Sequence, residues 1–374
     1  MSPHSLRRAL LAGVGAVVLT LSACSINTGG NTAASGAGGA AGRPANANVP
    51  SWCGPNKVSF ALADGFGDNN WRKVTAAESR AEAGKCPNVT SFSYTDGQGN
   101  TQKSISDVQG LVAKGTQALV VFPDAGQAML PALRSAFKAG ITTVPYRVSP
   151  GGQAGTDYTA FVSTDFTQAG VLWANWLVKV LHGKGNVLNL GGPPANSQSL
   201  EEYQGMQSVF RNHPGIKFVG TTPYEVTNWD AAQTQQVVTA ALARYPEIDA
   251  VTTDFGSALA SSFSAFTQAG RQIPAIATED SNQLACDWQS QKAAGHEFPL
   301  LTVSSQNAMS RLAVDVAVAH ASGGVVPKST VYPQGPFEDS VSGVPHQVTC
   351  DKSLPMDAFV SSSLTTAQQI AALK

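Results

Sequence analysis

Side chains able to hydrogen-bond to a small polar molecule, or to stack on it, follow the ends of several short apolar runs. The first run, residues 58–62, leads into a loop and then a helix start that carries an indole and a guanidinium group. Arginine offers a planar fork of donors, and an aromatic face covers the apolar side of a ring. The residues selected in this way as a candidate binding set are Phe66, Asn70, Trp71, Arg72, Arg147, Trp229, Asp254, Asp280, Asn282 and Gln306.

Each of these residues also has an ordinary structural alternative. Trp71 could pack in a core and Arg72 could be solvated, while Thr227 or Asp230 before a helix is typical of an N-cap. Polar residues after a strand are also common in turns. Their shared position favours a site, because strand ends on one side of a sheet line one crevice with donors and acceptors.

The apolar runs alternate with amphipathic stretches, which predicts strands alternating with helices and therefore a parallel sheet. The pattern occurs twice, in halves of about 110 to 140 residues, so we expect two doubly wound α/β lobes with a ligand in the crevice between them. The expected strands are 58–62, 89–94, 118–122, 142–146, 186–190, 217–221, 248–253, 275–278 and 300–304. The expected helices are 72–83, 102–114, 129–139, 166–181, 200–211, 231–244, 257–269 and 309–321.

Composition excludes some classes of partner. The 374 residues carry 24 Lys and Arg against 25 Asp and Glu, a net charge of −1. This balance gives no electrostatic reason to expect a nucleic-acid partner. No cofactor motif follows a strand, and the six histidines lack metal-ligand spacing, so we expect neither cofactor nor metal.

The N-terminus is typical of an export signal. Arg7 and Arg8 precede an uncharged run, and Leu21-Ser22-Ala23-Cys24 resembles a bacterial lipobox. We expect residues 1–23 to be a signal peptide and 24–53 to be a lipidated cysteine with a flexible tether rich in Gly and Ala. The alternative is an ordinary signal peptide cleaved nearby.

Four further cysteines fit disulfides in an oxidising compartment. Cys53 and Cys86 lie just before the first two strands, which are neighbours in most α/β sheets. We therefore expect Cys53 to pair with Cys86, and Cys286 with Cys350. Free buried thiols are the alternative.

Several stretches together resemble the type I periplasmic solute-binding proteins of ABC transporters, in the branch that binds ribose and galactofuranose. The resemblance spans about residues 55 to 370. The matching stretches are Asn70-Trp71-Arg72, residues 102–124 and 139–141, Ser163-Thr164-Asp165-Phe166 with Gly170, Asn228-Trp229-Asp230, residues 246–250 and Glu279-Asp280-Ser281-Asn282.

The resemblance implies two lobes joined by three hinge strands that close over a sugar, which we expect to be a monosaccharide. It also implies that an ABC permease and its ATPase then receive this sugar. We expect residues 54–163 with 307–335 in the N-terminal lobe and 164–306 with 336–374 in the C-terminal lobe. It implies a monomer outside the cytoplasmic membrane. It also adds Glu202 to the ligand contacts.

Two positions depart from the family pattern. Arg147 stands where members usually have an aspartate, and Glu202 opens a segment where they usually have an arginine. We hypothesise that Arg147 and Glu202 face each other across the cleft, so that their attraction favours closure.

Other functions remain open at this point. A bound amino acid would need opposite charges, which Arg72 and Asp280 offer, and a nucleoside or another solute is compatible with the same cleft. A lipoprotein that senses a ligand for a membrane receptor would have the same fold. Catalysis by strand-end carboxylates is disfavoured, because no GxSxG elbow or P-loop is present, and we expect no enzyme activity. A transcriptional regulator is disfavoured because the signal and tether occupy the place of a DNA-binding motif.

Overall fold

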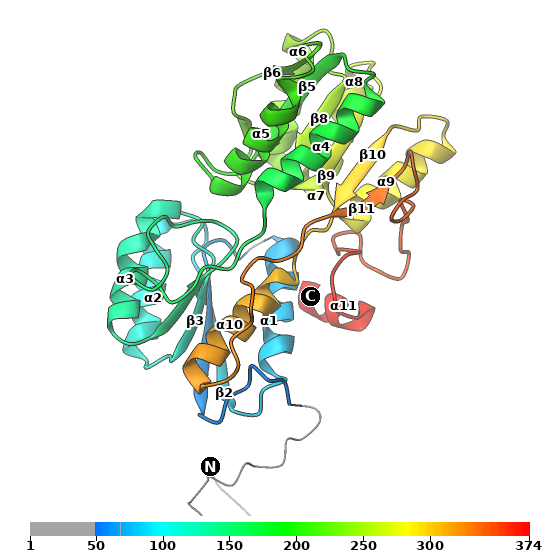
Figure 1. Ribbon diagram of the computed structural model, residues 1–374. Helices are drawn as coiled ribbons and strands as arrows, with labels where there is room; N and C mark the ends of the chain where they lie inside the picture. The colour runs from blue at the N-terminus through cyan, green and yellow to red at the C-terminus, as the bar shows by residue number, and fades with distance from the viewer. Residues whose placement is uncertain (1–48, 68) are drawn as a thin grey trace, which may run out of the picture. The chain divides into compact units, whose positions relative to one another are not determined.

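The computed structural model describes residues 49–67 and 69–374, in which two parallel sheets and their helices form two lobes (Figure 1). This confirms the expected fold class. The signal peptide, Cys24 and nearly all of the tether lie outside the described residues. Within the described part of the chain, no helix combines the length and the apolar character that a membrane span requires.

The sheet of the N-terminal lobe is parallel and has the strand order β2-β1-β3-β4. Alternate side chains of β1 enter different cores: Phe60 and Leu62 join one apolar cluster, and Ala61 and Ala63 join another. This two-sided burial is typical of a parallel sheet that is covered by helices on both faces. The strands are β1 Val58–Asp64, β2 Val89–Asp96, β3 Ala118–Val121 and β4 Thr142–Pro145.

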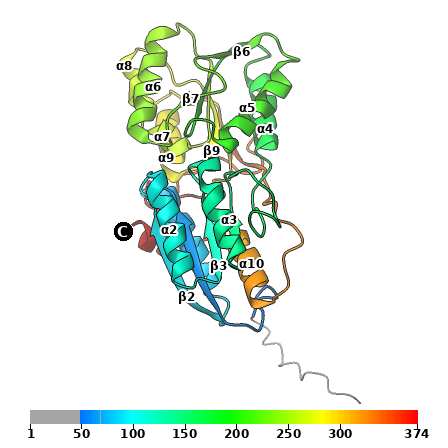
Figure 2. The ribbon, with the colours of Figure 1, turned by 90° about the vertical axis from the view of Figure 1, so that its left-hand side faces the viewer.

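Helices cover both faces of this sheet. Figure 2 shows α2 and α3 together on one face, and Figure 1 shows α1 beside α10 on the other. Asn69 begins α1, because its side chain accepts a hydrogen bond from the backbone N–H of Arg72. The helices of this lobe are α1 Asn70–Ala83, α2 Thr101–Ala113, the 3₁₀ turn η1 Gly126–Met129, α3 Leu130–Lys138 and α10 Met309–Ser322.

The sheet of the C-terminal lobe has the order β11-β10-β9-β8-β5-β6, with β7 also paired to β5. Only β11 is antiparallel to its neighbour. The strands are β5 Gly185–Gly191, β6 Ile216–Val219, β7 Glu225–Val226, β8 Ala250–Thr253, β9 Ala275–Glu279, β10 Leu300–Val303 and β11 Pro336–Asp339.

The helices of this lobe form two layers. One layer, α4 and α5, is tightly packed: a Cβ on Gly205 would lie 2.0 Å from the carbonyl oxygen of Thr167, so only glycine fits there. The expected helix 257–269 is two short helices, and α9 was not expected. The helices are α4 Phe166–Val180, α5 Ser197–Phe210, α6 Ala231–Arg244, α7 Gly256–Ala260, α8 Phe263–Gln268 and α9 Asn282–Ala293.

The chain passes from one lobe to the other in the segments that join β4 to α4, β10 to α10, and α10 to β11. Two of these crossings are joined to each other, since Ser163 donates its N–H to Thr330 and accepts a hydrogen bond from the N–H of Tyr332. These are the three connections that the resemblance implied.

A fourth crossing was not expected. Residues 351–365, here called the C-terminal strap, leave the C-terminal lobe and lead to helix α11, Thr366–Leu373, which packs on α1. Phe359 and Leu364 belong to the N-terminal core. The expected placement of all of residues 336–374 in the C-terminal lobe is therefore wrong for their last part, because these apolar side chains are buried against α1.

The structure joins Cys53 to Cys86 and Cys286 to Cys350, so both predicted pairings are confirmed. The second disulfide fixes the start of the strap to α9. Each cross-link restricts the unfolded chain, which is the main way in which disulfides stabilise a fold.

Candidate functional site

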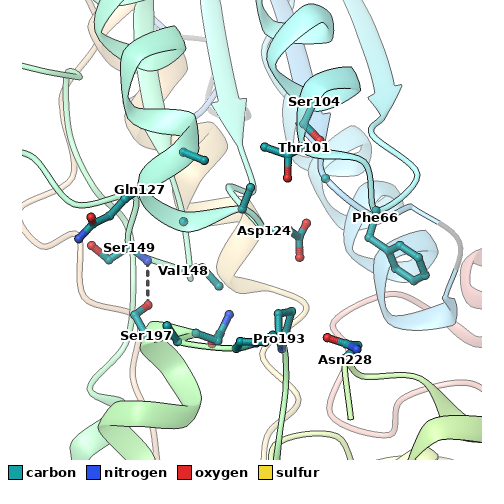
Figure 3. A pocket seen from close by; sticks show the side chains of 18 of the residues that line it. Phe66, Thr101, Ser104, Asp124, Gln127, Val148, Ser149, Pro193, Ser197 and Asn228 are labelled. Carbon is teal, nitrogen blue, oxygen red and sulfur yellow. Dashed lines mark hydrogen bonds between the residues drawn. The ribbon is translucent and has the colours of Figure 1, made fainter. Parts of the chain in front are cut away.

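A cavity of about 840 Å³, here called the outer cavity, lies between the lobes. Figure 3 shows Phe66, Thr101 and Asp124 of the N-terminal lobe above Ser197 and Asn228 of the C-terminal lobe. The carboxyl end of β3 leads to Asp124, and the N-terminus of α5 carries Ser197. Strand and helix ends of both lobes thus meet at one space, as a ligand crevice in an α/β protein requires.

Deeper between the lobes lies an inner compartment with only about 20 Å³ of free space, room for about one water molecule. Side chains fill the rest of it. Aromatic rings and charged groups alternate around it: Trp71, Arg72, Phe122, Arg147, Gln198, Trp229, Asp254, Phe255 and Glu279, with Asn69 at its edge.

Arg72 belongs to a network within the N-terminal lobe. Its Nη1 lies 3.1 Å from Asp64 Oδ1 and its Nη2 lies 2.6 Å from Asp124 Oδ1. The guanidinium carbon stacks 3.5 Å from the centroid of the Phe122 ring. Arg72 is therefore buried and held by protein groups on two sides, which fixes the position of the Asp124 carboxyl at the outer cavity.

Arg147 joins the two lobes. Its Nη2 donates to Glu279 Oε1 at 2.5 Å, and its Nε donates to Gln198 Oε1 at 3.0 Å. Glu202 is connected to Arg147 only through Gln198. The Nε2 of Gln198 donates to Glu202 Oε1 at 3.2 Å. The hypothesis that Arg147 pairs with Glu202 is therefore corrected: the acidic partner across the cleft is Glu279.

Five non-glycine residues around the site adopt the left-handed backbone conformation that side chains other than glycine rarely take. They are Arg147, Ala195, Asn228, Trp229 and Gln306, with φ values of 65°, 59°, 52°, 55° and 60°. Such strain persists where the surrounding structure enforces it, and it is typical of functional sites. Here it aims Trp229 into the space between the lobes.

Trp229 lines the outer cavity, the inner compartment and a third cavity of about 290 Å³. Its indole lies against the backbone of Gly192, where a Cβ would be only 2.4 Å from Trp229 Cε2. Its ring also meets Phe122 of the other lobe edge-on, with centroids 6.5 Å apart. Trp229 is thus an aromatic side chain that lines all three cavities.

Burial changes the acid chemistry of the site. It raises the pKa of Asp124 to about 7 and that of Glu279 to about 8, although Arg72 and Arg147 oppose these shifts. The pKa of Glu202 is well above its usual range because of burial and repulsion from Asp254 and Glu279. At neutral pH, burial thus favours a proton on Glu279, and a protonated carboxyl can donate as well as accept.

A family model described as a periplasmic binding protein domain matches residues 60–324. The chain belongs to this family. It is a family of solute-binding proteins, not of enzymes. In the described part of the chain, no group of three or more His, Cys, Asp or Glu side chains is placed to hold a metal ion.

Relatives of this periplasmic binding protein are distant. The xylitol-binding protein of Mycolicibacterium smegmatis is 25% identical over 167 residues, 44% of this chain and 46% of that protein. The chain thus aligns with about half the length of this relative. A solute-binding protein of an ABC transporter from Thermobispora bispora has the same fold, with a TM-score of 0.67, 22% identity, and coverage of 84% of this chain and 94% of that one.

A further structure with this fold is the fructose-binding periplasmic domain of a hybrid two-component system. Its TM-score is 0.66 at 20% identity, over 76% of this chain and 91% of that chain. At this identity the likeness concerns the fold alone.

Seven of the predicted binding residues line one of the three cavities of this periplasmic binding protein. They are Phe66, Asn70, Trp71, Arg72, Arg147, Trp229 and Asp254. Two others contact residues that line the inner compartment. Gln306 accepts a hydrogen bond from Arg147 Nη1 at 3.2 Å, and Glu202 accepts one from Gln198. Asp230 caps α6, so its structural alternative is confirmed.

Asp280 and Asn282 were expected to contact the ligand and instead hold the strap. The Asp280 carboxylate accepts hydrogen bonds from the N–H groups of Ser305 and Ser361. Asn282 Nδ2 donates to the carbonyl oxygens of Asp351 and Leu354, among others. Their donors and acceptors are used within the protein, and neither residue lines any of the three cavities described above.

The structure adds residues that the candidate set omits. Asp124 and Glu279 stand at strand ends, and Gln198 lies in the first turn of α5. The strand-end rule would have selected Asp124, which the sequence shows two residues after an apolar run. Gln198 carried no signal, since a glutamine in a helix is ordinary.

Proposed function

We propose that this protein captures a sugar or sugar-like solute between its lobes outside the cytoplasmic membrane and delivers it to an ABC permease. One observation carries the proposal: both lobes present aromatic rings and neutral hydrogen-bonding groups to one cavity. Phe66 and Thr101 come from one lobe, and Ser197, Asn228 and Trp229 come from the other. Hydroxyl groups need such donors and acceptors, and the apolar face of a ring needs an aromatic partner.

The relatives support a carbohydrate as the solute. The relative from Mycolicibacterium smegmatis is named for xylitol. The proposed ligand contacts are side chains of the outer cavity, with Trp229 and Asp124 foremost. We also propose that Cys24 carries a lipid that anchors the protein, on the basis of the lipobox.

The experiment is a thermal-shift screen of the purified chain against pentoses, hexoses, polyols, nucleosides and amino acids, followed by calorimetric titration of each hit. A ligand that binds only the folded state raises its melting temperature by mass action. We expect one carbohydrate class to raise the melting temperature. The variant Trp229→Ala should lower the affinity for that carbohydrate by about 10-fold or more, while Trp229→Phe should retain most of the affinity because it keeps an aromatic face.

Tyr203→Ala is the matched control, because Tyr203 is a partly exposed aromatic residue of the same lobe that packs on Phe218. Its affinity should equal that of the unchanged protein. A nucleoside or an amino acid as the sole hit, or no loss in Trp229→Ala, would contradict the proposal.

A second candidate function is ligand sensing for a membrane receptor. It is favoured by the fructose-binding structure of the same fold, which belongs to a two-component system. Transport assays in cells separate the two functions: deletion of the protein should abolish uptake of the identified sugar if it serves a permease, and should leave uptake intact if it serves a receptor.

A further inference from the structure

The two lobes contact each other on two sides of the outer cavity. On the inner side, Arg147 of one lobe bonds to Glu279 of the other at 2.5 Å. At the outer cavity itself, the N–H of Ser149 donates to Ser197 Oγ at 2.9 Å, the dashed line in Figure 3. The cavity is therefore not merely a gap between parted lobes, because it persists while these contacts are made.

The inner compartment has no room for a ring. The Arg147 guanidinium lies there between Glu279, Gln198 and Gln306, and stacks 4.7 Å from the Trp71 ring. A ring could enter only by separating Arg147 from Glu279, which would break a buried ion pair that a neutral ligand cannot replace with charges of its own. Buried charged groups are costly to leave unpaired, so the protein itself occupies this end of the cleft.

The outer cavity is large by comparison. Its volume of about 840 Å³ lies toward the upper end of the range of about 300 to 1,000 Å³ for pockets that hold drug-sized ligands. Small residues leave this space open: a Cβ on Gly126 would meet no atom within 4 Å. Ala128 and Gly151 also line it.

The chemistry of the lining fits a neutral, hydroxyl-rich ligand. Among the described residues, no lysine or arginine lines the outer cavity, and Asp124 is the one carboxyl that does. Figure 3 shows two ends: Phe66 and Asn228 lie at one, and Gln127 and Ser149 lie at the other, with Asp124 between them. Hydrogen-bonding groups therefore extend well beyond the aromatic end, where a single ring would stack.

We propose that the outer cavity holds a carbohydrate larger than one ring, a disaccharide or a glycoside. One unit stacks on Trp229 and Phe66 beside Asp124, and the second reaches toward Gln127 and Ser149. This inference rests on the proposed function, since it specifies which carbohydrates the same cleft binds. It differs from a single-ring site because the inner compartment stays closed by Arg147 and Glu279.

The test compares each monosaccharide with compounds built from it. The purified chain is titrated calorimetrically with xylose, xylobiose and methyl xyloside, with glucose, cellobiose and maltose, and with galactose, lactose and melibiose. We expect at least one disaccharide or glycoside to bind about 10-fold or more tightly than its own monosaccharide.

Ala128→Trp places an indole in the far part of the cavity. It should weaken the preferred larger ligand by about 10-fold or more and change the binding of its monosaccharide by less than about threefold. Ser135→Trp is the matched control, an exposed position on α3 outside the cavity, and should change neither affinity. Melting curves test whether both variants fold. If Ala128→Trp does not fold, Gln127→Trp is used in its place.

The outcomes are distinct. If a monosaccharide binds as tightly as every larger compound, and Ala128→Trp binds it normally, the inference is overturned while the proposed function stands. If no carbohydrate binds the unchanged protein, the proposed function fails and the inference fails with it.

Discussion

Asp124 is the carboxyl through which the buried network of the N-terminal lobe meets the outer cavity. One of its oxygens is held by Arg72 Nη2, and 16% of its side chain is exposed. Above its pKa of about 7, a carboxylate fixed in this way is a strong acceptor for ligand hydroxyls, because it needs no reorganisation when the ligand arrives.

Asp124→Asn should therefore lower the affinity for the identified carbohydrate by about 10- to 100-fold, the loss expected for one hydrogen bond to a charged group. The fold should persist, since Arg72 keeps its bond to Asp64. Calorimetric titration measures the affinity. Asp107→Asn removes a carboxylate paired with Lys103 on α2 and serves as the control. Equal affinities in the two variants would exclude Asp124 as a contact.

At this scale the sequence predicts part of the site. Trp71, Arg147 and Trp229 were selected by their place after strands, and the structure puts all three at the inner compartment. The run Glu279-Asp280-Ser281-Asn282 shows the limit. Only Glu279 faces that compartment, and which of four successive polar residues faces a cleft depends on backbone geometry that residue types do not encode.

Among the elements, the buried strands were the easiest to predict. The expected runs 58–62 and 118–122 correspond to β1 and β3, whose apolar side chains are buried on both faces. Helix α9 escaped prediction because it is mostly polar and buries chiefly Leu284, Ala285 and Trp288. The last helix, α11, escaped because its binding surface on α1 is distant in sequence.

The strap is the element whose role depends most on one side chain. Asp280 accepts hydrogen bonds from Ser305 at one crossing between the lobes and from Ser361 in the strap. Asp280→Asn should lower the free energy of unfolding by about 2 to 3 kcal/mol, because a buried group loses charged hydrogen bonds. Ligand affinity should change by less than about threefold.

Urea denaturation and titration with the identified ligand measure the two effects of Asp280→Asn. The reverse pattern, normal stability with lost binding, would return Asp280 to the set of ligand contacts from which the structure removes it. Ser353→Ala, an exposed position in the strap, is the control and should match the unchanged protein in both measurements.

For the whole molecule, several buried carboxyls share one electrostatic property. Burial raises the pKa of Asp315 and Glu338 to about 7, as it does for Asp124 and more strongly for Glu279. A carboxyl with a raised pKa binds its proton more tightly in the folded chain than in the unfolded one. The resulting stability is present at low pH and is lost as the pH rises through about 7 to 8.

The melting temperature should therefore be lower at pH 8.5 than at pH 6. Glu338→Gln removes one contributing group while keeping an acceptor for the N–H of Thr349. This variant should be more stable than the unchanged protein at pH 8.5, by on the order of 1 to 3 kcal/mol, and less sensitive to pH. Unfolding curves at both pH values decide this, and an unchanged slope in Glu338→Gln would contradict it.

The position of Trp229 has an optical consequence. The chain has six tryptophans, and five of them, at positions 52, 71, 173, 176 and 288, are buried. Trp229 is the partly exposed one, and it borders every cavity described between the lobes. Indole emission shifts with the polarity of its surroundings, so the intrinsic fluorescence of this protein should report the arrival of a ligand without any attached dye.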